Sequence, residues 1–84
     1  MTIEHHPLVK EHPEYRQLIH ELKVGDPEFR ALFDEYHEVD RRIYRIDQDI
    51  EPVAEDFANE LKRRRLYLAD RLLHMLREAE ARSS

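Results

Sequence analysis

Hydrophobic residues between positions 29 and 50 have the spacing of a helix that packs along another helix. They recur at alternating intervals of three and four residues, at Phe29, Leu32, Tyr36, Val39, Ile43, Ile46 and Ile50. This heptad pattern predicts one long amphipathic helix with a continuous apolar seam. A second seam follows the next proline, at Ala54, Ala58, Leu61, Leu68, Leu72, Met75 and Ala79.

The two seams match when the second helix runs antiparallel to the first. Opposing layers such as Ile43 with Leu61 then form along the whole length, and the residue numbers of every pair add to 104. Pro52 cannot continue a helix and lies at the centre of this register. The chain is therefore predicted to be all-α, a long antiparallel helical hairpin of about 27–50 and 53–81.

A short helix is predicted at about 13–24, before the hairpin. Pro13 suits a first helical position, where a missing N–H has no consequence. Apolar residues follow at helical spacing, at Tyr15, Leu18, Ile19 and Leu22. Residues 1–12 have few apolar anchors and are expected to be a flexible arm with room for one turn, so 13–84 form a single domain.

The boundary between the short helix and the hairpin is marked by three consecutive residues. Gly25, the only glycine, is expected to end the short helix in a left-handed conformation. Asp26 and Pro27 then read as the N-cap and first residue of the next helix.

The last helix carries apolar residues outside its seam, at Leu66, Ala69, Leu73 and Leu76. The short helix could cover them, with Leu22 near Leu76, or a second copy of the chain could. A hairpin this thin has a small core, which favours help from a partner helix. The candidate protein interface comprises Leu66, Leu73, Leu76, Tyr44 and Tyr67.

One seam position is polar. Arg65 lies opposite Val39, where a buried guanidinium would be costly unless it pairs or extends to solvent. Asp40 is the nearest acid on that layer. The alternative is that the seam is half exposed at this point.

A basic run, Lys62 to Arg65, is the alternative functional feature. Together with Arg71 and Arg77 it could contact phosphates in a nucleic-acid-binding hairpin. Successive helical residues point about 100° apart, however, so the run is no single patch. Acids of the first long helix should neutralise part of it, and no stacking aromatics are interleaved, so nucleic acid is disfavoured.

The overall composition further narrows the classes of protein to which this chain could belong. The chain has 84 residues, 39% of them charged, 14 basic against 19 acidic, and a net charge of −5. The absence of cysteine excludes disulfides and thiol chemistry and fits a reducing compartment, so a cytoplasmic location is expected. No apolar run is long enough for a membrane span, and the first ten residues do not resemble a signal peptide.

The sequence contains no residue pattern that indicates a catalytic site. His5, His6 and His12 cluster in the expected arm without the spacing of a zinc site. Ordered serine, threonine or cysteine nucleophiles are lacking, and one glycine excludes a glycine-rich phosphate loop. We therefore expect no enzyme activity, cofactor, metal or small-molecule substrate.

Several motifs resemble the YdcH-like family of small bacterial proteins. They span nearly the whole chain: His12-Pro-Glu-Tyr, His20-Glu-Leu-Lys, Leu32-Phe-Asp-Glu-Tyr-His-Glu, Glu60-Leu-Lys and Arg64-Arg-Leu. The resemblance implies a long α-hairpin behind a short first helix, in a family without assigned function. The function predicted is a small helical protein-interaction or structural module, either a homo-oligomer or a binder of another helical protein.

Overall fold

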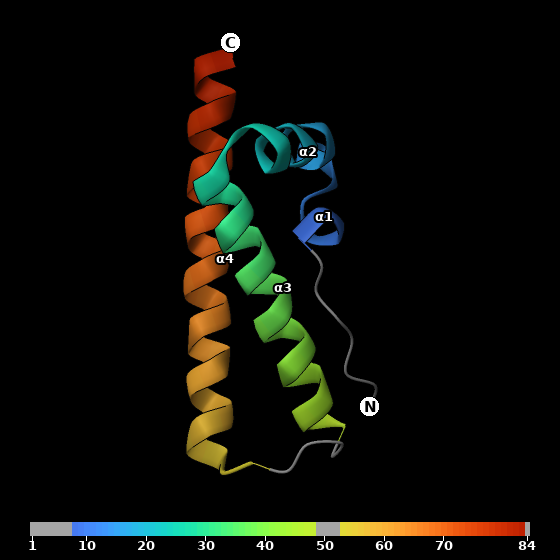
Figure 1. Ribbon diagram of the computed structural model, residues 1–84, viewed down its shortest axis with the longest axis vertical. Helices are drawn as coiled ribbons and strands as arrows, with labels where there is room; N and C mark the ends of the chain where they lie inside the picture. The colour runs from blue at the N-terminus through green and yellow to red at the C-terminus, as the bar shows by residue number, and fades with distance from the viewer. Residues whose placement is uncertain (1–7, 49–52, 84) are drawn as a thin grey trace.

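The computed structural model describes residues 8–48 and 53–83, and all of their regular structure is helical. The elements are, in chain order, α1 (Leu8–Glu11), the 3-10 turn η1 (Pro13–Tyr15), α2 (Arg16–Gly25), α3 (Pro27–Asp47) and α4 (Glu55–Ser83). The two long helices α3 and α4 run antiparallel side by side, and α2 crosses near the open end of the hairpin (Figure 1). The predicted all-α hairpin is confirmed.

Ion pairs between the long helices report their register. Within residues 8–48 and 53–83, ion pairs join Arg64 with Glu35, Arg65 with Asp40, Arg71 with Glu28, and Lys62 with Asp47. Their residue numbers add to between 99 and 109, on both sides of the predicted value of 104. The predicted value lies within this range, so the ion pairs between the two helices agree with the predicted register. Contact between Ile43 and Leu61 stays a prediction.

The helix ends near the tip differ slightly from the predicted ones. α3 ends at Asp47, and α4 begins at Glu55, where the Ala58 N–H donates to the Ala54 carbonyl over 3.1 Å. The predicted turn at Pro52 lies outside the described residues.

The core lies at the open end, where all the helices meet. Its buried members come from four helices: Leu8, Ile19, Phe29, Tyr36, Leu68, Leu72 and Leu76. Each large side chain removed from water contributes about 1.5–3 kcal/mol, so this cluster is the main source of stability. Toward the tip the hairpin is thinner, and Ile43 is the buried hydrophobic residue that continues the core.

The junction between α2 and α3 is a single residue. Asp26 Oδ1 accepts hydrogen bonds from the backbone N–H groups of Glu28 at 3.0 Å and Phe29 at 3.2 Å. The predicted N-cap and the first-position Pro27 are confirmed. The expectation for Gly25 is wrong, because it is the last residue of α2 and does not adopt a positive φ. The extended Asp26 makes the turn instead, which removes any need for a left-handed glycine.

Part of the expected arm packs on the hairpin. Leu8 is 1% exposed, and its N–H donates to Nε2 of His37 over 3.4 Å. His37 can accept this bond because its Nδ1 donates to the Phe33 carbonyl at 2.9 Å. The short helix also differs, since Pro13–Tyr15 is a 3-10 turn and the α-helix begins at Arg16. Residues 1–7 lie outside the described part, and their flexibility stays a prediction.

Candidate interaction surface

The structure divides the five predicted interface residues among different environments. Leu76 is 0% exposed and belongs to the chain's own core, so it is not available to a partner. The reason is that α2 packs against α4 and brings Ile19 and the half-buried Leu22 to the same cluster. The short helix is therefore the cover for this part of the extra apolar stripe.

Leu66, near the middle of α4, is the most exposed of the five predicted interface residues, with 64% of its area exposed. Leu73, one heptad further along, is half-buried. Both lie on one stripe of α4, which we call the outer flank and define as Glu55, Asn59, Lys62, Leu66, Asp70, Leu73 and Arg77. At 3.6 residues per turn these seven residues fall within about 40° of Leu66 around the helix.

The two tyrosines do not share this flank. Tyr67 is 51% exposed but points about 100° away from Leu66. Its ring centre lies 5.3 Å from the guanidinium carbon of Arg64, a cation–π contact. Tyr44 is half-buried on α3. The five residues thus form no single patch, and the exposed part reduces to Leu66 with Leu73 at its edge.

The basic residues of α4 are mostly engaged within the chain. Lys62 and Arg64 reach across to α3 carboxylates at 3.7 and 2.7 Å, and Arg71 does so at 3.0 Å. Arg63 pairs one turn away with Glu60 at 3.0 Å. Among the described residues, Arg77 has no carboxylate within 4 Å. The side chains of the basic run therefore point in different directions, and carboxylates of the same chain neutralise their charges.

Arg65 and Asp40 form the most buried of these pairs. Arg65 Nη1 lies 2.8 Å from Asp40 Oδ1, and the two side chains are 26% and 4% exposed. The predicted pairing is confirmed, and the guanidinium keeps partial access to water. A carboxylate this buried needs such a partner, because an isolated charge in the core would be strongly destabilising.

Other acids of α3 pair locally on its exposed side. Arg30 contacts Asp34 at 3.1 Å, and Arg41 contacts Glu38 at 2.9 Å. The hydrogen bond from Arg41, followed by its positive charge, lowers the pKa of Glu38 below its ordinary value. Both side chains are exposed, so water screens this interaction. These pairs leave the α3 acids with local or cross-hairpin partners.

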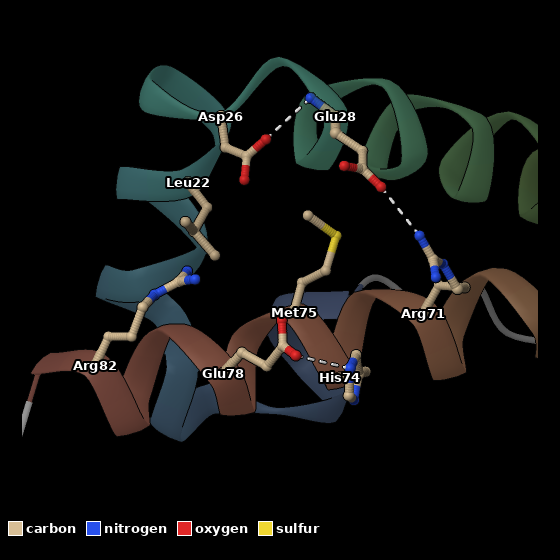
Figure 2. Close-up of a pocket in the computed structure, with 8 residues that line it drawn as sticks. All are labelled: Leu22, Asp26, Glu28, Arg71, His74, Met75, Glu78 and Arg82. Atoms are coloured by element: carbon tan, nitrogen blue, oxygen red, sulfur yellow. Dashed lines mark hydrogen bonds and ion pairs between the residues drawn. The ribbon is translucent and has the colours of Figure 1, made fainter.

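A depression of about 370 Å³ opens beside the α2–α3 junction, against the C-terminal half of α4 (Figure 2). Its polar side chains largely pair with one another, Glu28 with Arg71 at 3.0 Å and His74 with Glu78 at 3.0 Å. Met75 supplies an apolar patch between them. Three carboxylates, two arginines and His74 line the depression, so opposite charges are nearly balanced and neither sign dominates the site.

A metal site needs several ligands close together, and a membrane span needs a long apolar helix. Residues 8–48 and 53–83 contain no group of three or more His, Asp or Glu arranged to hold a metal ion. His12 approaches Glu14 at 3.4 Å, whereas His5 and His6 lie outside the described residues. No described helix combines the length and apolarity needed to cross a bilayer.

Similarity to known proteins agrees with this helical architecture. Residues 29–76, most of the hairpin, match the family described as "Protein of unknown function (DUF465)". The chain is 33% identical over 66 residues to "Uncharacterized protein YdcH" of Escherichia coli (strain K12), covering 79% of this chain and 89% of that protein. The same values hold for YdcH of Shigella flexneri. No solved structure matches. The chain therefore belongs to the DUF465 family of proteins of unknown function, which confirms the YdcH-like resemblance of its motifs.

Proposed function

We propose that this chain is a non-enzymatic helical interaction module that self-associates through the outer flank of α4. The observation that carries the proposal is the 64% exposure of Leu66 at the middle of the longest helix. Leu66 lies on the side of α4 that the other described helices leave uncovered. Leu73, one heptad away, lies on the same side. Covering this side with another helix would remove Leu66 from water, which is favourable.

The small core is a second support. The buried core cluster extends from the open end to the middle of the hairpin, and the half near the tip has little interior. Domains of this size commonly gain stability from association. A partner helix along α4 would extend the packed layer over the thin part of the hairpin.

The electrostatics favour this function over nucleic-acid binding. A phosphate-binding surface needs several free cations on one face, because affinity comes from phosphate neutralisation. Lys62, Arg63, Arg64 and Arg65 each contact a carboxylate of the same chain instead. Phosphates would have to compete with those carboxylates.

Light scattering coupled to size-exclusion chromatography tests the proposal. A monomer has a mass of 10.3 kDa. We expect the mass to rise toward twice this value between low micromolar and millimolar concentrations. Leu66→Ser should shift the transition to higher concentration, whereas Tyr67→Ser, a matched change on another side of the same turn, should not. A wild-type monomer throughout, or equal effects of the two changes, would refute the proposal.

A mobility-shift titration at low salt tests the alternative. We expect no binding of RNA or duplex DNA tighter than roughly the 10⁻⁴–10⁻⁶ M non-specific range. Tight binding that a double change, Arg63→Glu with Arg64→Glu, abolishes would instead make the chain a nucleic-acid-binding hairpin.

A further inference from the structure

We propose that the partner of the outer flank is a second copy of the chain, with α4 antiparallel to α4 and Leu66 on the two-fold axis. This inference rests on the proposed function and adds an orientation and a register. It follows from the order of residues along the flank and from the charges that the fold leaves available.

The outer flank is symmetric about Leu66. Its seven positions are separated by intervals of four, three, four, four, three and four residues, which read the same in both directions. Six of the seven side chains are exposed, and Leu73 is half-buried. A two-fold axis at Leu66 therefore places each flank position opposite another flank position of the second copy, with residue numbers adding to 132. Such an isologous contact is the usual geometry of a homodimer.

The charges on the flank are complementary in this arrangement. Lys62 lies opposite Asp70 of the second copy, and Glu55 lies opposite Arg77 of the second copy. The symmetry repeats both contacts, which gives four ion pairs arranged around the central leucines. Complementary charge of this kind fixes orientation and register more than it adds affinity.

The fold leaves these charges available for an intermolecular contact. Within residues 8–48 and 53–83, Glu55, Asp70 and Arg77 form no ion pair. Lys62 is 46% exposed, and its Nζ is 3.7 Å from Asp47 Oδ1, the longest of the cross-hairpin pairs. Most other cations of the first half of α4 are engaged at 2.7–3.0 Å. The flank therefore combines the exposed leucine with charges that have few or no partners in the monomer.

Other pairings of the same flank place like charges together. A parallel arrangement brings Lys62 to Lys62 and Asp70 to Asp70. An antiparallel arrangement moved by one heptad, with Leu66 opposite Leu73, brings Lys62 opposite Arg77. Like-charge contacts disfavour both arrangements. Of these three arrangements, the one with its axis at Leu66 pairs opposite charges at both charged layers.

The proposed interface is narrow. From Glu55 to Arg77 the flank is about 33 Å long at 1.5 Å per residue, and Leu66 is its main apolar contact. Interfaces smaller than the standard size are typical of weak complexes. We therefore expect a dissociation constant in the micromolar range or weaker.

Disulfide trapping tests the register directly, because the chain has no cysteine. A Leu66→Cys variant should form a disulfide-linked dimer under mild oxidation, since the two residues meet at the axis and a disulfide requires a short Cα separation. Leu73→Cys is the matched control, because its two copies would be about 21 Å apart along the helices. A mixture of Asn59→Cys and Leu73→Cys chains should link to each other more than either links to itself.

Charge exchange tests the orientation independently. Lys62→Glu or Asp70→Lys alone should weaken dimerisation on the order of tenfold or more, because each creates two like-charge contacts. The double variant should regain most of the wild-type affinity, and helical circular dichroism should show all three variants folded. A wild-type monomer would overturn both proposals. The wild type could instead dimerise while Leu66→Cys forms no disulfide-linked dimer and the double charge variant regains no affinity. That result would support self-association but would overturn the antiparallel pairing at Leu66.

Discussion

The buried pair of Arg65 and Asp40 gives a quantitative test of how the hairpin is held together. Replacing Arg65 by Met keeps an unbranched side chain of similar length but removes the guanidinium 2.8 Å from the Asp40 carboxylate. Breaking a buried pair by removing one partner is destabilising by about 3–5 kcal/mol. Arg65 is 26% exposed, so water can reach part of the site, and we expect the lower end, about 3 kcal/mol.

A loss of this size is large for the chain. A domain of 84 residues has a stability of about 4–12 kcal/mol, so the substitution removes a substantial fraction. Arg64→Met is the matched control one residue away, because its pair with Glu35 is 47% and 41% exposed. Exposed pairs contribute about 0–1 kcal/mol. Urea unfolding followed by far-ultraviolet circular dichroism, at one fixed protein concentration, measures both changes.

A double variant separates the charge from the packing. Asp40→Asn combined with Arg65→Met removes the uncompensated charge and should recover at least about 1 kcal/mol relative to Arg65→Met alone. Equal losses for Arg65→Met and Arg64→Met would show that burial does not decide the strength of these pairs. If the double variant is no more stable than Arg65→Met alone, the loss comes from packing and not from the unpaired Asp40 carboxylate.

Further changes test other parts of the fold by the same unfolding measurement. Leu72→Ala should cost about 2–5 kcal/mol because Leu72 is fully buried, whereas Leu66→Ala should be nearly neutral in the monomer; similar values would contradict the burial described. Asp26→Ala should cost about 1 kcal/mol through loss of its two N-cap hydrogen bonds, and no change would mean that the cap is dispensable. Gly25→Ala should stabilise by about 0.4–1 kcal/mol, because a methyl group meets nothing within 4 Å and φ is not positive; destabilisation would imply a left-handed residue. Glu38 should titrate below its ordinary pKa in a nuclear magnetic resonance titration, so its small contribution to stability is present near neutral pH and is lost as the pH falls through that lowered value.

The sequence by itself determined the hairpin and several local features. The heptad spacing of two seams fixes which residues share a face, and a single antiparallel register joins them. The Asp26–Pro27 helix start was predictable because capping depends on a few neighbouring residues. The pairing of Arg65 with Asp40 was predictable because a polar residue within an apolar seam needs the nearest opposite charge.

Only the tertiary structure decided which apolar residues are covered and which stay exposed. Periodicity marked Leu66, Leu73 and Leu76 alike as surplus, but α2 packs over one end of the stripe, burying Leu76 and leaving Leu66 in solvent. Leu8 likewise joins the core through α1 and His37, with no periodic signal in the sequence to announce it. The physical reason is that local spacing sets the faces of a helix, whereas burial of a face depends on which distant segment gains most by packing there.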